Sequence, residues 1–178
     1  MGTMNTFSGK KFDPVKMTVE DICLEDIGHA LSLLCRGGGH LKYFYSVGQH
    51  SVNCMKEAEA RGWSKRVQLA CLLHDASEAY LSDIIRPVKE NLVGYLELEN
   101  RIMEKVLERF GLDDLSEEEK RKWKQIDDDM LNFELRVLMG DKEEGEAVKM
   151  YSEPAMEEKR WQEVEKEFVE LAVSLAEL

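Results

Sequence analysis

The chain of 178 residues lacks the features that mark membrane, fibrous and secreted proteins. No apolar run approaches the ~20 residues that a membrane-spanning helix needs, and the N-terminus does not resemble a signal peptide. Only three prolines occur and no low-complexity tract is present, so we expect neither a linker nor a repeat. We therefore expect one soluble, cytoplasmic domain over residues 1–178, long enough to bury most of its apolar surface.

The four cysteines are too widely spaced to suggest a disulfide framework or a zinc motif. Cys23, Cys35, Cys54 and Cys71 form no CxxC pair, and they lie within or beside apolar segments. This placement is typical of reduced core thiols in an intracellular protein.

Positive charge is scarce. The chain has 24 lysines and arginines against 36 aspartates and glutamates, which gives a formal net charge of -12. A field of that sign disfavours attraction to nucleic acid or to an acidic membrane, so we expect neither as a partner. A small anionic substrate remains compatible with this charge if a local cationic patch or a metal ion reverses the field.

Hydrophobic periodicity predicts an all-α bundle of about six helices behind an extended N-terminal arm, residues 1–20. The third helix is apolar almost all round and should be the central, buried one. Ser46 and Gln49 predict a reciprocal capping box at the start of the second helix. The six predicted helices span approximately residues 24–35, 47–61, 64–74, 95–110, 116–139 and 154–175.

The last predicted helix, within residues 154–178, carries an apolar stripe with steps of three and four residues. Such a stripe suits either packing on the core or the seam of a homodimer, and the sequence does not separate the two. The stripe consists of Trp161, Val164, Phe168, Leu171 and Leu175.

The stretch from Ala70 to Glu78 ends an apolar helix in a dense group of polar side chains. On a continuous helix, His74 and Glu78 stack at i,i+4 and Asp75 and Glu78 at i,i+3, so all three crowd one sector. Burying an imidazole and two carboxylates is costly unless something compensates, and a bound divalent cation is the commonest compensation.

Two other helices supply candidate ligands. His50 lies in the first turn of the second helix, where a rigid, capped start suits a ligand held in one rotamer. Asp127 shares the inward face of the fifth helix, whereas Asp128 and Asp129 can point to water. Taken alone, a histidine such as His29 or His50 would be an ordinary structural residue and the acidic triplet a solvated face. Two neutral imidazoles and two carboxylates together suit Mn, Co, Zn, Fe or Mg: His50, His74, Asp75 and Asp127.

This order of motifs resembles the HD superfamily of metal-dependent phosphohydrolases. Beyond the four residues, the segments 44–51, 72–80 and 83–89, and the pair Asp127 and Glu134, are similar to the compact nucleotidase-like branch with 5'-deoxynucleotidase activity. The resemblance covers about residues 7–139 and implies an HD-type helical bundle. It also implies one divalent metal ion held by those four ligands, and the four histidines of the chain are too few for the dinuclear HD sites.

The resemblance implies hydrolysis of a phosphomonoester, such as a nucleoside 5'-monophosphate or a similar small metabolite, by attack of a metal-bound water. By position, Glu78 corresponds to the glutamate that orients or deprotonates this water, beside the ligand Asp75. The place of Glu78 one turn beyond the ligands fits general-base work independently.

The resemblance also implies residues that bind the substrate. Arg36, Lys89 and His40 correspond to phosphate contacts, and Asp83 to a contact with the sugar or the leaving oxygen. One departure is Gly37, where relatives often carry an aromatic residue that would stack on a nucleoside.

Two other functions remain open. The protein could bind a nucleotide or a phosphorylated metabolite without turnover, as a metal-containing sensor, although an intact Glu78 favours an enzyme. Alternatively, it could be a helical interaction module in which His50, His74 and Asp127 are satisfied core polar groups.

Overall fold

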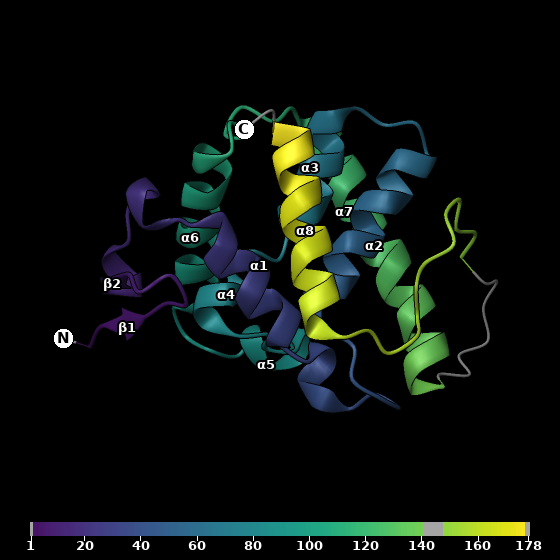
Figure 1. Ribbon diagram of the computed structural model, residues 1–178, viewed down its shortest axis with the longest axis horizontal. Coiled ribbons are helices and arrows are strands. Elements are labelled where there is room, and N and C mark those ends of the chain that lie inside the picture. The colour runs from purple at the N-terminus through teal and green to yellow at the C-terminus, as the bar shows by residue number, and fades with distance from the viewer. Residues whose placement is uncertain (1, 141–147, 177–178) are drawn as a thin grey trace.

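The computed structural model describes residues 2–140 and 148–176, and this part of the chain is mostly helical (Figure 1). The prediction of an all-α fold is confirmed. Two one-turn helices, α4 (Glu78–Leu81) and α5 (Arg86–Lys89), connect the third and fourth of the longer ones. The longer helices are α1 (Leu24–Leu33), α2 (Val47–Ala60), α3 (Lys65–Leu73), α6 (Tyr95–Arg109), α7 (Glu117–Glu134) and α8 (Trp161–Ala176).

The N-terminal arm is folded onto the helices, so the prediction that it is extended throughout is only partly right. Strand β1 (Met4–Asn5) pairs antiparallel with β2 (Lys11–Phe12), and two 3-10 turns follow, η1 (Pro14–Lys16) and η2 (Val19–Asp21). The buried Asp26 of α1 accepts hydrogen bonds from Ser8 N at 2.6 Å and Ser8 Oγ at 2.8 Å. These bonds anchor the arm to α1.

Helix α3 is central, as predicted, and contacts α2, α7 and α8. Figure 1 shows α8 crossing in front of α3, with α1 on one side and α2 on the other. Val164 and Phe168 of α8 are buried, and Leu171 and Leu175 pack against the same core. Fully burying a side chain of this size contributes about 1.5–3 kcal/mol. The C-terminal stripe is therefore core packing within the chain.

Helix α8 begins at Trp161 rather than at Pro154, where we predicted it. The preceding residues are held by side chains of α2: Gln49 Nε2 donates to the carbonyls of Ala155 and Glu157, both at 2.9 Å. A helix through this segment would need those carbonyls for its own hydrogen bonds.

The same contact breaks the predicted capping box of α2. Ser46 Oγ accepts from Gln49 N at 3.0 Å as expected, but the Gln49 side chain does not return to Ser46 because it binds the segment before α8.

Helix α3 ends at Leu73, close to the predicted end at residue 74, so the expectation that His74, Asp75 and Glu78 stack on one continuous helix is wrong. Residues 74–77 form tight turns instead, with Ala76 N donating to Leu73 O and Glu78 N to Asp75 O, each at 2.9 Å. Helix α7 runs on through a π-type turn, η4 (Leu135–Met139), up to Gly140, which has a φ of 71° and ends it near the predicted position.

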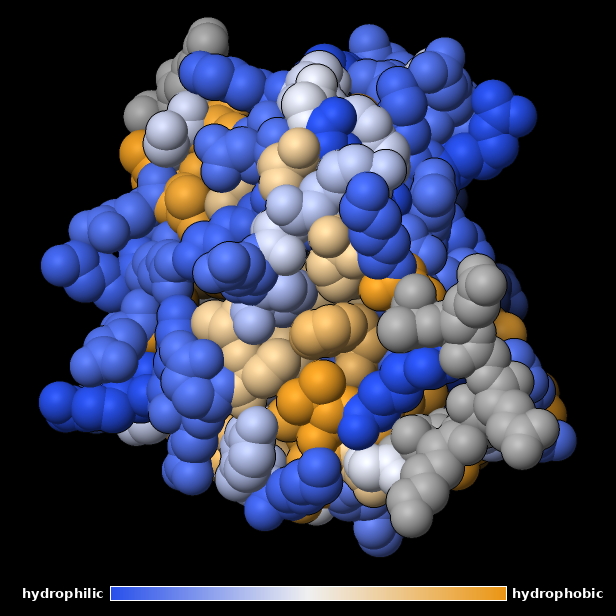
Figure 2. Space-filling model, turned by 90° about the vertical axis from the view of Figure 1, so that its right-hand side faces the viewer, coloured by the Kyte–Doolittle hydropathy of each residue, from blue (hydrophilic) through white to orange (hydrophobic). Residues whose placement is uncertain are grey.

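Charged and polar side chains dominate the face shown in Figure 2, where they surround a smaller apolar band. Among the described residues, no helix combines the length and apolar character needed to cross a membrane.

Candidate metal centre and its two pockets

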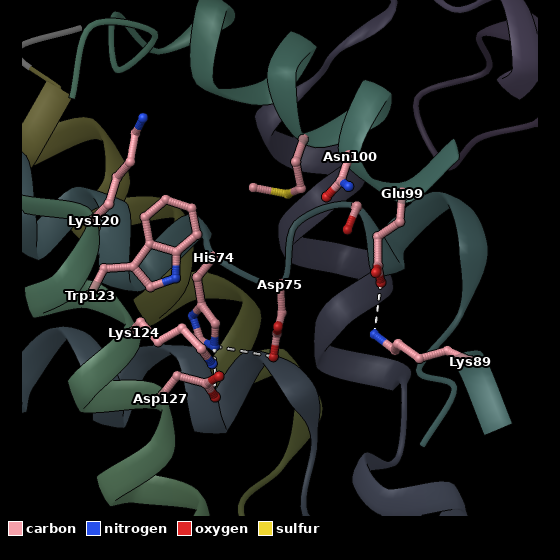
Figure 3. A pocket seen from close by; sticks show the side chains of 11 residues that line it. His74, Asp75, Lys89, Glu99, Asn100, Lys120, Trp123, Lys124 and Asp127 are labelled. Carbon is pink, nitrogen blue, oxygen red and sulfur yellow. Dashed lines mark hydrogen bonds and ion pairs between the residues drawn. The ribbon is translucent and has the colours of Figure 1, made fainter. Parts of the chain in front are cut away.

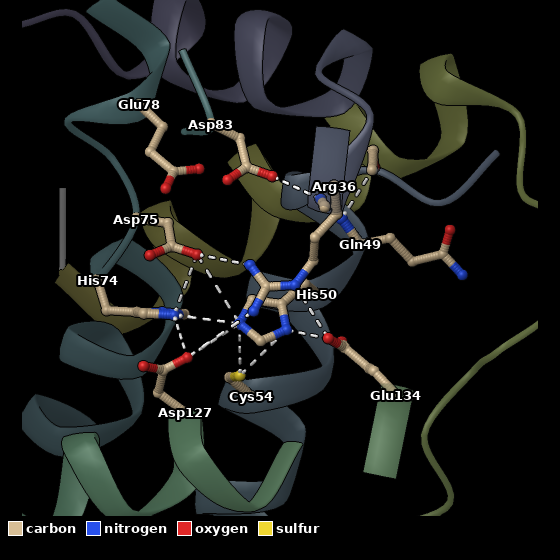
Figure 4. Close-up of polar contacts among 12 residues, drawn as sticks. Arg36, Gln49, His50, Cys54, His74, Asp75, Glu78, Asp83, Asp127 and Glu134 are labelled. Carbon is tan, nitrogen blue, oxygen red and sulfur yellow. Dashed lines mark hydrogen bonds and ion pairs between the residues drawn. The ribbon is translucent and has the colours of Figure 1, made fainter. Parts of the chain in front are cut away.

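The four predicted metal ligands meet at one point, although they come from three parts of the chain (Figure 4). His50 Nε2 lies 3.1 Å from His74 Nε2, 3.5 Å from Asp127 Oδ1 and 3.8 Å from Asp75 Oδ2. His74 Nε2 lies 3.3 Å from Asp75 Oδ2 and 3.5 Å from Asp127 Oδ1. Two ligand atoms bound to one ion at about 2.1 Å are about 3.0–3.4 Å apart. Two of these five distances fall within that range, two are 3.5 Å, and the distance from His50 to Asp75 is longer, at 3.8 Å.

The outer nitrogen of each histidine already has a partner. His50 Nδ1 contacts Glu134 Oε1 at 2.6 Å, and His74 Nδ1 contacts the carbonyl oxygen of Cys71 at 2.7 Å. Both partners accept hydrogen bonds, so each Nδ1 carries the hydrogen and each Nε2 of a neutral ring presents a lone pair. When both rings are neutral, two lone pairs and two carboxylates face one another, and only a proton or a metal ion can lie favourably between them. This donor set fits a cation.

The charges around the cluster favour the same conclusion. Burial opposes protonation of His74, but Asp75 and Asp127 outweigh it and raise the pKa of His74 well above its usual range. Burial opposes ionisation of Asp75 and Asp127, yet the neighbouring imidazoles lower the pKa of both carboxyls. The carboxylates are ionised, and the site stabilises positive charge between them, whether from a proton or a metal ion.

Glu134 is a site residue to which the sequence analysis assigned no role. It is buried, and it accepts hydrogen bonds from His50 Nδ1, from Tyr45 Oη at 2.8 Å and from Arg36 Nε at 2.9 Å. Burial opposes its ionisation, but His50 and Arg36 lower its pKa. It lies where α7 widens into the π-type turn, a distortion common at functional sites. Its position two turns after Asp127 on the buried stripe was the signal that could have revealed it.

Arg36 lies among the carboxylates of the cluster. Its Nη1 is 3.2 Å from Asp75 Oδ2, its Nη2 is 3.9 Å from Asp127 Oδ1, and Nε donates to Glu134. Burial opposes its charge, but the three carboxylates raise the pKa of Arg36 further above its already high value. The guanidinium therefore stabilises the acidic groups around the two histidines.

Cys54 also reaches the cluster, and the buried group of His50, Cys54 and His74 could hold a metal ion. Its Sγ lies 3.5 Å from Nε2 and 4.0 Å from Nδ1 of His50. Such similar distances place the sulfur beside the ring and out of line with the Nε2 lone pair. Burial and the charge of Glu134 raise the pKa of the Cys54 thiol well above its usual range. The ionised carboxylates are therefore better partners for a cation than this thiol.

The first of two pockets beside the cluster, here called the α5 pocket, has a volume of about 430 Å³. Glu78 lines it, and this side chain is 5% exposed, with an Oε2 atom that has no hydrogen-bond partner among the described residues. Lys89 Nζ is 3.8 Å from Glu78 Oε1. Burial, and then the charges of Asp75 and Asp83, raise the pKa of Glu78 to about 10. A cation beside Asp75 would favour the ionised form.

Asp83 is held at the edge of the α5 pocket by a strained backbone. Its Oδ2 accepts a hydrogen bond of 2.7 Å from Gly37 N, in the 3-10 turn η3 (Arg36–Gly39). Ser82, with φ 74° and ψ 159°, is the non-glycine residue with a positive φ in the described part of the chain. A non-glycine residue in this region costs roughly 1–3 kcal/mol. Such strain is common at functional sites, and here it directly precedes Asp83.

The second pocket, here called the α6–α7 pocket, has a volume of about 360 Å³ and opens between those two helices (Figure 3). Asp75, Lys89 and Asp127 line both pockets. The cluster therefore forms part of the wall that the two pockets share. The other residues that line the α6–α7 pocket are His74, Ser77, Glu99, Asn100, Met103, Lys120, Trp123 and Lys124.

Three predictions about polar residues have different outcomes. His40 is exposed and lines neither pocket, so the structure does not bring it to the site as a substrate residue. His29 is structural, as expected: it stacks on Phe7 with ring centroids 3.8 Å apart. Asp129 does not simply point to water, because its Oδ2 accepts a hydrogen bond of 2.8 Å from Arg61 Nη2.

No protein-family model matches this chain. It is 40% identical to the uncharacterized protein YfdR of Escherichia coli (strain K12) over 112 residues, which cover 63% of this chain and 60% of YfdR. It is 43% identical to an uncharacterized protein of Rhodobacter capsulatus over 111 residues, which cover 59% of this chain and 56% of that protein. The matched region is thus less than two thirds of the length of either relative.

Proposed function

We propose that this protein is a metal-dependent phosphohydrolase of the HD superfamily that acts on a nucleoside 5'-monophosphate or a similar small phosphorylated metabolite. The observation that carries the proposal is the meeting of two imidazole Nε2 atoms with the carboxylates of Asp75 and Asp127, at distances of 3.1–3.8 Å. The motif order of the sequence supports the same class.

His50, His74, Asp75 and Asp127 would hold one divalent ion, which could be Mn, Co, Mg, Fe or Zn. When bound, such an ion polarises a phosphoryl oxygen and makes water a stronger nucleophile at neutral pH. Glu134 and the Cys71 carbonyl hold the two imidazoles in the tautomer that this role needs.

Glu78 is the candidate general base. Its Oε2 atom has no other hydrogen-bond partner among the described residues, so it is available to accept a proton from the attacking water. Lys89 Nζ, at 3.8 Å from Oε1, favours the ionised carboxylate that a base requires.

The α5 pocket would hold the rest of the substrate. Arg86 at its mouth is 55% exposed at the side chain and can contact a phosphate, as can Lys89 and Arg36. Asp83 offers a carboxylate to a hydroxyl. Gly37 brings no ring to this pocket, and the apolar walls are aliphatic: Ile84, Ile85, Pro87, Leu131, Leu135 and Met139.

The direct test is phosphate release by purified protein that has been stripped of metal and refilled with Mn, Co, Mg, Fe or Zn. Nucleoside monophosphates and other phosphomonoesters would serve as substrates. We expect release with at least one metal, loss of metal and activity in D75N, and retained metal with a lower rate in E78Q. No release with any metal, together with no metal retained, contradicts the proposal. D129N is the matched control, because Asp129 belongs to the same acidic triplet as the ligand Asp127 but pairs with Arg61 and lines neither pocket.

A sensor is the second candidate function, and the environment of Glu78 favours it. Without a cation beside Asp75, a carboxyl with a pKa raised to about 10 is protonated at neutral pH, and in that form it donates a hydrogen bond and cannot act as a base. If the metal-loaded protein binds nucleotides but releases no phosphate, the sensor is the correct function.

A further inference from the structure

We propose that the α6–α7 pocket binds a second phosphate group of the substrate, so that the protein prefers small molecules that carry two phosphates. This inference rests on the proposed function, because the first phosphate is taken to lie at the metal centre. Asp75, Lys89 and Asp127 line both pockets, so one ligand at the cluster can reach into each.

The side chains of this pocket that lack partners can all donate hydrogen bonds. The Trp123 indole N–H, the Ser77 hydroxyl and the Asn100 amide make no hydrogen bond to any residue that the structure describes. An indole can only donate, and a hydroxyl and an amide can do so. Figure 3 shows the indole nitrogen on the side of the ring that faces His74, with Asn100 across the pocket. Donors that converge in this way suit an anion.

Two lysines add exchangeable positive charge. Lys120 pairs with Glu117 and Lys124 with Asp128, but these carboxylates are 84% and 45% exposed at the side chain. Exposed pairs of this kind contribute little stability, so either ammonium can leave its partner for a phosphate. The lining of this pocket holds three lysines and three carboxylates, so it is less acidic than the chain as a whole, which has a net charge of -12.

The acidic residues of the pocket do not oppose the proposal. Glu99 Oε1 is neutralised by Lys89 Nζ at 2.7 Å, and Asp75 and Asp127 face the proposed cation. The α5 pocket is a poorer place for the second phosphate. Its Arg36 is engaged by Asp75 and the buried Glu134, its Arg86 is taken to contact the first phosphate, and its apolar walls are aliphatic.

The test measures binding to E78Q, which should hydrolyse the ligand more slowly than the wild type, with the divalent metal in excess. Calorimetry would compare a nucleoside 5'-monophosphate with the corresponding 3',5'-bisphosphate and 5'-diphosphate. We expect at least one doubly phosphorylated ligand to bind roughly tenfold tighter than the monophosphate, as one charge-assisted hydrogen bond provides. Adding K120Q and K124Q should remove most of this preference. Adding W123F, which keeps a ring but removes the N–H, should reduce it.

K122Q is the matched control, since Lys122 lies on the same helix, pairs with Glu118 and lines neither pocket. It should keep the preference. Equal affinity for singly and doubly phosphorylated ligands, or a preference that survives K120Q with K124Q, overturns the inference and leaves the proposed function intact. Failure of the wild-type protein to bind metal and to hydrolyse any phosphomonoester overturns the proposed function itself.

Discussion

Helix α2 carries two buried polar clusters. In one, hydrogen-bond donors face an acceptor, and in the other, acceptors face acceptors. On one side, the fully buried Glu57 accepts hydrogen bonds from Tyr151 N, Ser152 N, Ser152 Oγ and Arg61 Nε, at 2.6–3.1 Å. On the other side, His50 lies against His74 and two carboxylates. There the Nε2 atoms of the two imidazoles and the carboxylate oxygens all point at one another as hydrogen-bond acceptors. The first cluster is complete without any ligand and fixes the segment before α8. The second is complete only when a proton or a metal ion lies among its ligand atoms, and this difference separates a structural network from a candidate site.

The largest expected effects come from breaking the two clusters separately. D127N should lower metal affinity by more than about 100-fold, because even residues behind a ligand are worth about 10–100-fold. It should lower the free energy of unfolding of the metal-free protein by less than E57Q does, because Asp75 still faces His74 in this variant. E57Q should do the opposite. It should destabilise the fold by about 1–3 kcal/mol, because buried donors lose a charged acceptor, and leave metal affinity within about twofold.

Calorimetric metal titration and denaturant unfolding of both variants test this pair. If D127N unfolds as easily as E57Q, or if E57Q also loses metal, the two clusters are not distinct in the way we describe.

The next effect concerns Glu134, which contacts His50 but no proposed ion. E134Q should lower metal affinity by about 10–100-fold, because an amide no longer fixes the hydrogen on His50 Nδ1. Y45F is the control: it removes one of the hydrogen bonds to Glu134 and keeps the carboxylate, so it should lower affinity less. Equal metal affinity in E134Q and the wild type would show that Glu134 does not position His50.

The contributions of Glu78 and Glu57 to the free energy of unfolding should depend on pH with opposite signs. The pKa of Glu78 is raised to about 10, so the folded metal-free protein binds this proton more tightly than the unfolded chain. Its contribution to the free energy of unfolding is fully present below the unfolded value near 4.3 and falls as the pH rises towards 10, by up to about 1.4 kcal/mol per pH unit.

Denaturant unfolding of the metal-free wild type and E78Q between pH 5 and 9, a range set by these two pKa values, should show a smaller decline in E78Q. Glu57 has the opposite sign: its pKa is lowered by Ser152 and Arg61 despite burial, so its contribution is lost only as the pH falls below about 4.5. Parallel curves for the wild type and E78Q would contradict the assignment for Glu78.

The smallest effect concerns the strained backbone before Asp83. S82G should raise the free energy of unfolding by about 1 kcal/mol, because glycine adopts a φ of 74° without the side-chain penalty. S82A keeps a Cβ and should give no such gain. Thermal unfolding of the two variants decides, and an equal midpoint for S82G and S82A would show that this residue stores no strain.

The sequence predicted the structure best where the pattern within a single helix determines which of its faces is buried. The stripe of α8 and the apolar α3 follow from periodicity alone, and both pack as core. Local patterns were misleading where a distant segment competes for the same groups. Gln49 cannot complete its capping box because it binds the carbonyls of Ala155 and Glu157, more than 100 positions away.

The sequence predicted the metal ligands of the candidate site, but not the residues that contact those ligands. The residue types and their positions in the sequence were sufficient to predict that four side chains form one site: His50, His74, Asp75 and Asp127. Glu134 and Cys54 were not assigned because their roles depend on the direction of side chains from separate helices. His40 was assigned by resemblance, and the backbone of the Arg36–Gly39 turn places it in solvent.

The central claim is that the facing lone pairs of His50 and His74 and the two carboxylates form a cation site. Calorimetric titration of metal-free protein with Mn, Co and Zn, with elemental analysis of the product, tests it most directly. We predict one ion per chain in the wild type and none in a variant that combines D75N with D127N. Absence of binding in the wild type, or an ion retained by the double variant, would contradict the claim.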